Sequence, residues 1–318
     1  MDLAFFVGIR YNKNNEFSEE NAMLTAQELQ AKLTAGPLIL DGATGSNLMK
    51  AGMPRGCCTE EWVLNNPEPL RALQQAYREA GSDILYAPTF QAQPIALKRV
   101  DLDKQTEAVN AALVALTRSA AEGALVAGNL TTLAVYMDSF DEANFDELVE
   151  NYRRQIHGLL DGGADLLAAE TLMYPTEAEA ILTAAELEGA GAVLYTFTMQ
   201  SDGSLFSGRE AGPILAELAH AGAAAVGFNC VNADAALPGL VSKLRRFTDA
   251  PLVCKPNAGM PVISPAGIPE YAMSPADFAS IQADCRAMGA SILGGCCGTT
   301  PVHIRAMVEK VKETAKRF

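Results

Sequence analysis

Three cysteines in two distant stretches of the chain have the types and spacing of a metal site. Cys296 and Cys297 are adjacent in the glycine-rich segment GGCCGTT at residues 294–300, and Cys230 ends the segment GFNC. A soft thiolate set selects zinc, and three protein ligands leave the fourth tetrahedral position of the ion for water or substrate. The three sulfurs therefore predict a catalytic zinc site. The competing interpretation is that each cysteine is a small buried hydrophobic residue.

The other four of the seven cysteines fit packing roles better. Cys57 and Cys58 are adjacent in the segment PRGCC, where packing within a loop is the favoured interpretation. The sequence leaves open whether these two thiols approach the metal site. Cys254 lies in an apolar run and Cys285 in a stretch of helical spacing, so both are expected in the core.

Composition and charge exclude several classes of protein. The 318 residues are 49% hydrophobic, which is enough to bury a large core, and the net charge of −14 argues against nucleic acid or an anionic membrane as a partner. No apolar run approaches the ~20 residues that span a bilayer, and the N-terminus lacks the basic and small-residue signals of a secretory leader. We therefore expect a cytoplasmic protein with reduced cysteines.

Eight short apolar runs alternate with stretches of helical spacing. The runs are residues 37–41, 83–88, 124–129, 165–171, 192–198, 223–229, 251–256 and 291–296. Eight strands alternating with helices predict an α/β fold, a (β/α)8 TIM barrel, with a doubly wound open sheet as the alternative. Residues 1–23 are expected to form a loosely ordered N-terminal extension ahead of a barrel domain at residues 24–318. The sequence leaves open whether residues 1–22 belong to the physiological protein.

Polar side chains follow the ends of the predicted strands. They include Asp41, Thr89, Asn129, Glu170, Gln200, Asn229, Lys255 and Asn257. In a barrel of parallel strands all these ends meet at the C-terminal rim, where active sites form. Cys230 would end the sixth strand and the Cys296–Cys297 pair the eighth, so this rim would bring the three sulfurs together in one zinc site.

The cysteine set, together with the segment DGATG at residues 41–45, resembles the homocysteine S-methyltransferase family. The resemblance covers roughly residues 34–310, and the segment GGCCGTTP is its most specific part. Within the family the chain is most similar to the homocysteine-binding barrel of cobalamin-dependent methionine synthase. One departure is the segment APTF at residues 87–90, because family members commonly have Asn before Thr-Phe. A substrate contact from that position is therefore not expected here.

The resemblance implies roles for named residues of this chain. Cys230, Cys296 and Cys297 would bind one Zn²⁺ per chain, and the homocysteine sulfur would take the fourth position. Asp41 and Glu170 would hold the substrate ammonium. The other substrate-binding residues implied are Gly42, Ala43, Thr44 and Asn229. The implied activity is zinc-dependent methyl transfer to the thiol of L-homocysteine, giving methionine.

The methyl donor is expected to come from outside the chain. The sequence has no room for the folate and cobalamin modules of full methionine synthases and contains no Asp-x-His-x-x-Gly segment. A separate methyl-corrinoid protein carrying methylcobalamin, supplied by a methyltetrahydrofolate system, is the favoured donor over S-methylmethionine or betaine. Two other functions stay open. One is a non-catalytic zinc and homocysteine binding subunit of a methyltransferase complex, and the other is a lyase that forms a Schiff base through Lys255.

Overall fold

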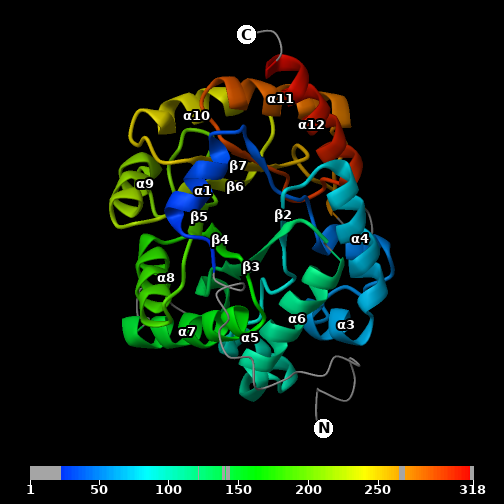
Figure 1. The fold of residues 1–318 in the computed structure, drawn as a ribbon, viewed down its shortest axis with the longest axis vertical. Coiled ribbons are helices and arrows are strands. Elements are labelled where there is room, and N and C mark those ends of the chain that lie inside the picture. The colour runs from blue at the N-terminus through cyan, green and yellow to red at the C-terminus, as the bar shows by residue number, and fades with distance from the viewer. Residues whose placement is uncertain (1–22, 121, 138–139, 141–143, 265–268, 316–318) are drawn as a thin grey trace.

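The strands form a barrel that is closed by parallel pairing. The computed structural model describes residues 23–120, 122–137, 140, 144–264 and 269–315 (Figure 1). One sheet of eight strands runs in the order β1-β10-β7-β6-β5-β4-β3-β2, and a parallel bridge between Leu40 and Ile84 joins its two edges. This confirms the predicted TIM barrel. Apart from Met23, the predicted N-terminal extension lies outside the described residues.

All eight predicted strands are present in the expected places. Their bounds are β1 Leu38–Ile39, β2 Ile84–Tyr86, β3 Leu125–Thr131, β4 Leu166–Leu172, β5 Val193–Phe197, β6 Ala225–Asn232, β7 Leu252–Asn257 and β10 Ile292–Leu293. The sequence did not indicate a short antiparallel hairpin after β7, formed by β8 Val262–Ile263 and β9 Pro269–Glu270. This hairpin lies on the side of the barrel where β7 ends.

Helices follow the strands and surround the barrel (Figure 1). The longer ones are α4 Pro67–Ala80, α6 Thr106–Ala120, α7 Phe145–Asp161, α8 Pro175–Leu187, α9 Ala211–His220, α10 Leu237–Arg245, α11 Pro275–Ala287 and α12 Pro301–Ala315. Several end at a glycine in the left-handed region just before the next strand, as Gly81 (φ 105°) does after α4. Glycine adopts this conformation without a Cβ clash, so these residues stop the helix and turn the chain into the barrel.

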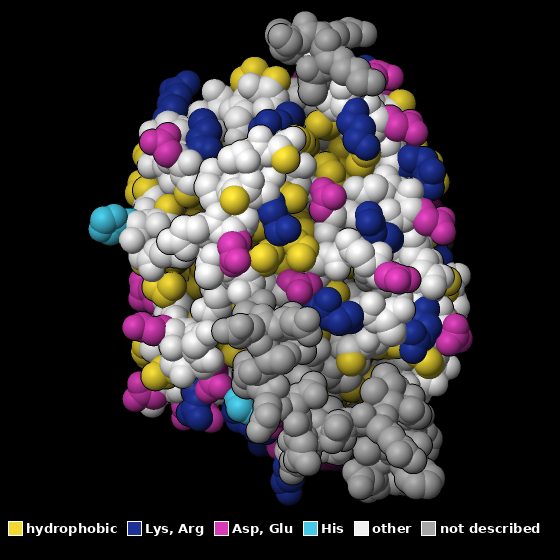
Figure 2. Space-filling view, in the orientation of Figure 1, with side chains coloured by type: hydrophobic (Ala, Val, Ile, Leu, Met, Phe, Trp, Pro, Cys, Tyr) yellow, Lys and Arg dark blue, Asp and Glu magenta, His cyan; other side chains and the backbone are white. Residues whose placement is uncertain are grey.

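The shorter helices lie mostly in the loops after β1 and β2. They are α2 Gly45–Lys50, α3 Thr59–Asn65 and α5 Pro94–Leu97. Another helix, α1 Ala26–Leu33, precedes the barrel and lies in front of the strands in Figure 1. Figure 2 shows acidic, basic and uncharged side chains interspersed over this face, without a basic stripe among the described residues in view. No described helix has the length and apolar character needed to cross a membrane.

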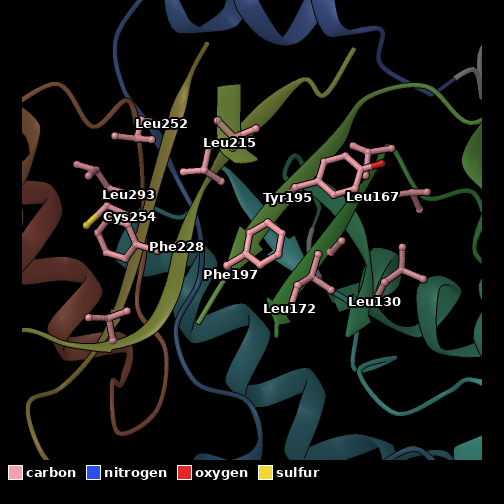
Figure 3. Close-up of a cluster of buried hydrophobic side chains, with 14 of the residues drawn as sticks. Leu130, Leu167, Leu172, Tyr195, Phe197, Leu215, Phe228, Leu252, Cys254 and Leu293 are labelled. Atoms are coloured by element: carbon pink, nitrogen blue, oxygen red, sulfur yellow. The ribbon is translucent and has the colours of Figure 1, made fainter. Parts of the chain in front are cut away.

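Alternating side chains divide the core into two parts. Outward positions of the strands pack under the helices, as Figure 3 shows for Leu130, Leu167, Tyr195 and Phe228. Inward positions form a second cluster inside the barrel. Its members in the strands, and at Leu40 just after β1, include Leu38, Leu40, Ile84, Tyr86, Ala127, Leu166, Ala168, Leu194, Val253 and Ile292. Because side chains on a strand alternate with a period of two, the next inward positions toward the strand ends reach the C-terminal rim.

Candidate active site

The structure brings together the three cysteines that lie far apart in the sequence. The Sγ atoms of Cys230, Cys296 and Cys297 all lie within 4.8 Å of one another, and those of Cys230 and Cys297 are 3.9 Å apart. Zn–S bonds of about 2.3 Å in a tetrahedron separate two sulfurs by about 3.8 Å, and the distance between Cys230 and Cys297 already has this value to within 0.1 Å. Among the described residues, this is the one group of three or more His, Cys, Asp or Glu side chains that lie close enough together to hold a metal ion.

The loop with the paired cysteines is fixed to the end of β7. Cys296 N–H donates to the carbonyl of Pro256 at 2.7 Å, and Cys297 N–H donates to Asn257 Oδ1 at 3.0 Å. Gly298 follows with a φ of +79°, and a Cβ there would overlap the ring of Tyr271. The glycine therefore permits both the turn after the cysteines and the close approach of that ring.

Cys230 reaches the site through an irregularity in β6. Strict alternation would point residue 229 inward and residue 230 outward. The pairing of β6 with β7 shifts register between Asn229 and Asn232, and Cys230 has a φ of 59°. A β-bulge of this kind redirects a side chain, and left-handed backbone at a non-glycine residue is typical of functional sites. The bulge turns the Cys230 sulfur toward Cys297.

A matching irregularity lies in β4, and Asn229 connects the two. Thr171 also has a φ of 59°, which is unusual for a β-branched residue, and β4 shifts register against β5 at this point. Asn229 Oδ1 accepts the Thr171 N–H at 2.7 Å, and its Nδ2 donates to Thr171 Oγ1 at 2.7 Å. The fully buried Asn229 side chain thus holds both distorted strand ends together. Substrate contact by Asn229 stays a prediction.

Beside the cysteines lies a buried polar cluster, made of Asp41, Asn129, Glu170, Asn229 and Lys255. Four of them occupy the next inward strand positions after Ala127, Ala168, Gly227 and Val253. Glu170 accepts hydrogen bonds from Asn129 at 2.9 Å, from Lys255 at 2.8 Å and from Asn229 at 3.4 Å. Asp41 Oδ2 accepts the N–H of Tyr86 at 2.8 Å. The two carboxylates expected to bind substrate are therefore inside the same cluster.

Burial and neighbouring charge set the ionisation of this cluster. Desolvation raises the pKa of Asp41 from 3.8 to about 7, and the charge of Lys255 opposes this only in part. Desolvation favours neutral Lys255, but the negative charges of Glu170, Cys296 and Asp41 outweigh it and raise the pKa of Lys255 well above its ordinary value. Lys255 is therefore protonated and ion-paired, which is unsuitable for a lysine that must attack a carbonyl group.

The three thiols also affect one another. Hydrogen bonds from Cys230 and Cys296 lower the pKa of Cys297, and the same sharing raises the pKa of Cys230. A thiolate at Cys297 is stabilised because two neighbouring S–H groups donate to it. The cluster therefore favours one ionised sulfur before any metal binds, and a metal ion takes thiolates rather than thiols as its ligands.

The residues after Asp41 are tied to the start of α12. Ala43 N–H donates to Thr299 Oγ1 at 3.1 Å, so this donor is already used within the protein. A Cβ on Gly42 would lie 2.6 Å from the Tyr77 hydroxyl, so glycine is needed for that contact. Thr44 precedes α2 without a side-chain capping bond. Their predicted contacts with substrate stay predictions.

The remaining cysteines lie outside the metal cluster. Cys57 Sγ donates to the carbonyl of Pro54 at 3.0 Å, and Cys58 Sγ lies 3.4 Å from Glu60 Oε2. Both pack against a separate hydrophobic cluster, in agreement with the packing interpretation. Cys254 and Cys285 are fully buried in the main core.

A cavity of about 330 Å³ opens beside Cys230. Of its other lining residues, only Gln200 was expected at the rim from the sequence. Its wall combines a carboxylate, an aromatic ring and thioethers, and among its residues are Met199, Gln200, Phe206, Asn232, Asp234 and Met260. Phe206 and Met260 are more than half exposed. The cavity therefore provides a further binding space that borders the metal cluster at Cys230.

Comparisons with known proteins identify the family to which the chain belongs. A model of the family described as homocysteine S-methyltransferase matches residues 38–311. The chain is similar to the metallated form of the homocysteine methyltransferase MmuM from Escherichia coli, with 27% identity and a TM-score of 0.76. The match covers 89% of this chain and 99% of MmuM. A methyltransferase from Methanosarcina mazei, 14% identical with a TM-score of 0.60 over 92% of this chain and 99% of its own, shares the fold. The chain belongs to the homocysteine S-methyltransferase family and is a methyltransferase.

Proposed function

We propose that this chain binds one zinc ion through Cys230, Cys296 and Cys297 and transfers a methyl group to the thiol of L-homocysteine, giving methionine. The observation that carries the proposal is the convergence of the three sulfurs within 4.8 Å of one another, because three cysteine ligands leave one position of a tetrahedral zinc ion for a further thiol. Zinc bound there would hold the acceptor sulfur as a thiolate at neutral pH, where a free thiol of pKa about 8.5 is mostly protonated.

The polar cluster binds and orients the acceptor. Asp41 and Glu170 are the carboxylates proposed to receive its ammonium group, and both are less than one-tenth exposed. Gly42, Ala43 and Thr44 belong to the same proposed site. Fixing the acceptor in a buried pocket aligns its sulfur with the methyl group and removes competing water, which supplies much of the rate enhancement in such transfers.

The donor is a small methyl-onium compound bound in the cavity beside Cys230. A volume of about 330 Å³ falls in the usual range for small-molecule sites. Its wall suits a methylated cation, because Asp234 supplies negative charge and Phe206 an aromatic face. In the reaction the new bond joins the methyl carbon to the acceptor sulfur, and the bond from that carbon to the onium atom breaks. The leaving group departs neutral with the electron pair, and the thiol proton passes to solvent when the acceptor binds.

A methyl-corrinoid protein, the donor that the sequence favoured, is the second candidate. The observation in its favour is a strip of exposed apolar side chains near the same cavity, formed by Met260, Val262 and Ile263, which are 71%, 65% and 64% exposed. A macromolecular donor needs such an open surface, because its cofactor must approach from outside the rim. S-methylmethionine, betaine and a methyl-corrinoid protein are therefore compared in one assay.

The test measures methionine formed by the purified, zinc-loaded chain from L-homocysteine and each donor. Turnover with an onium donor alone supports the first candidate, and turnover only with the corrinoid protein supports the second. No turnover with any donor, although zinc and homocysteine bind, would identify a non-catalytic binding subunit instead. Cys296→Ser should abolish turnover, whereas Cys57→Ser, the same change outside the metal cluster, should retain it. A Schiff-base lyase is disfavoured, because Lys255 is ion-paired to Glu170 at 2.8 Å.

A further inference from the structure

The side chain of Asn229 links the metal cluster to neighbouring strands of the barrel. Its Oδ1 accepts the backbone N–H of Thr171 in β4 at 2.7 Å and the hydroxyl of Thr196 in β5 at 3.0 Å. A backbone N–H can only donate, so this contact fixes which end of the amide is the oxygen. The amide nitrogen donates to Thr171 Oγ1 at 2.7 Å, to Glu170 Oε2 at 3.4 Å and to Cys296 Sγ at 3.8 Å.

These contacts use the whole hydrogen-bonding capacity of the amide. Both lone pairs of Oδ1 have a donor, one N–H of Nδ2 is directed to Thr171, and the other lies toward Cys296 and Glu170. The side chain is also fully buried. Asn229 therefore acts on the site through its partners within the protein.

Two of the residues that Asn229 holds or adjoins have an unfavourable backbone conformation. Thr171 and Cys230 both have a φ of 59°, in the left-handed region that L-residues avoid because of their Cβ atoms. Such conformations persist only when the surrounding structure fixes them. Asn229 makes two hydrogen bonds to Thr171 and directly precedes Cys230 in the chain. One side chain thus stabilises the bulge that directs the Cys230 sulfur into the cluster.

The same amide reaches the second segment of the metal cluster, through its contact with Cys296 in the loop after β10. Groups that hydrogen-bond to metal ligands orient those ligands and set the affinity of the site. We propose that Asn229 is a positioning residue that pre-organises the sulfurs of Cys230 and Cys296 before the metal ion binds. The inference rests on the proposed function, because it concerns the metal that this function requires. Asn229 does so without contacting the acceptor.

The test measures the affinity of the reduced protein for Zn²⁺, in competition with a chromophoric chelator. Homocysteine is left out, so neither turnover nor a contact with the acceptor contributes. Asn229→Ala should weaken zinc binding by about 10- to 100-fold. Asn110→Ala is the matched control, because Asn110 is another fully buried amide, which donates to the carbonyls of Ala92 and Thr106. It should lower stability in urea and keep the wild-type affinity for zinc.

A spectroscopic measurement separates positioning from a general loss of stability. In the Co²⁺-loaded protein, Asn229→Ala should move the sulfur-to-metal charge-transfer band to lower energy, because the amide N–H no longer stabilises the lone pairs of Cys296. Asn110→Ala should leave the band in place. A band that stays in place in Asn229→Ala would overturn the role of the amide at this sulfur.

The strain at Thr171 gives a further test. Glycine adopts left-handed backbone without a Cβ clash, so Thr171→Gly alone should change zinc affinity little. Asn229→Ala should then cost several-fold less affinity in the Gly background than in the native one, because the amide has less strain to hold. If Asn229→Ala alone does not fold, the double variant is compared with Thr171→Gly. It should bind zinc several-fold more weakly, because the contact with Cys296 is lost.

The outcomes distinguish this proposal from the proposed function. The role of Asn229 is overturned if Asn229→Ala binds zinc as tightly as Asn110→Ala, or if its loss of affinity is the same in both backgrounds. Methionine formation by the wild-type protein, together with unchanged zinc affinity in Asn229→Ala, would overturn this role and leave the proposed function standing. Weakened zinc binding in Asn229→Ala, without methionine formation by the wild-type protein from any donor, would refute the proposed function and support the role of Asn229.

Discussion

Replacing Asp41 with Asn should change how the stability of the protein depends on pH. Burial raises the pKa of Asp41 from 3.8 to about 7 in the folded chain, and the unfolded chain should ionise near the ordinary value. Below both values the residue is protonated in both states and makes no difference. As pH rises between them, the unfolded chain releases a proton that the folded chain keeps, so the free energy of unfolding falls by about 1.4 kcal/mol per pH unit. Above pH 7 the full penalty is about 4 kcal/mol.

The assay is urea unfolding of the metal-free, reduced protein at about pH 5 and about pH 8. Asn does not titrate, so the free energy of unfolding of Asp41→Asn relative to the native protein should increase by about 3 kcal/mol between these conditions. The constant effect of the amide on packing cancels in this comparison. Asp284→Asn, at an exposed carboxylate on α11, is the matched control and should show no such increase. A difference between Asp41→Asn and the native protein that is the same at both pH values would show that burial does not raise the pKa of Asp41 in the folded chain.

Three other predictions follow from the same geometry. Gly298→Ala and Gly163→Ala both place a side chain at a φ of +79°, which should cost each about 1–2 kcal/mol of stability. Only the Cβ of Gly298→Ala overlaps a ring, that of Tyr271, so this variant should lose more stability and should also weaken zinc binding in a metal titration. Glu177→Ala should lower Tm, at a cost of roughly 3 kcal/mol, because its carboxylate accepts the N–H groups of the loops after β3 and β4. The double variant Cys57→Ser/Cys58→Ser should keep its full zinc content by elemental analysis, because neither thiol belongs to the metal cluster.

The barrel could be predicted because its signals are local. Each strand is a short apolar run, and helix-ending glycines such as Gly81 and Gly289 mark the joint before the next strand. The position of Cys230 and of the Cys296–Cys297 pair followed from the rule that parallel strands end at one rim. The cluster of three sulfurs therefore needed only the strand count and the topology.

The details that shape the site could not be predicted in this way. The bulges at Thr171 and Cys230 depend on pairing between strands, and neither residue type indicates left-handed backbone. Lysine is usually exposed, so the burial of Lys255 against Glu170 follows only from the inward alternation of β4 and β7. The alternation itself was present in the sequence, where Val253 and Lys255, or Ala168 and Glu170, are two residues apart. Lys255 was already expected at the rim, and combining this alternation with the barrel would also have paired it with Glu170.

Cys230, Cys296 and Cys297 are proposed to hold a catalytic zinc ion. The most direct measurement is the zinc content of the purified, reduced protein together with its production of methionine from L-homocysteine across the donor panel. We expect one zinc per chain and methionine formation for the wild-type protein, and loss of both in Cys296→Ser. Wild-type protein that makes methionine without zinc, or Cys296→Ser protein that keeps both its zinc and its activity, would show that these cysteines do not form a catalytic zinc site.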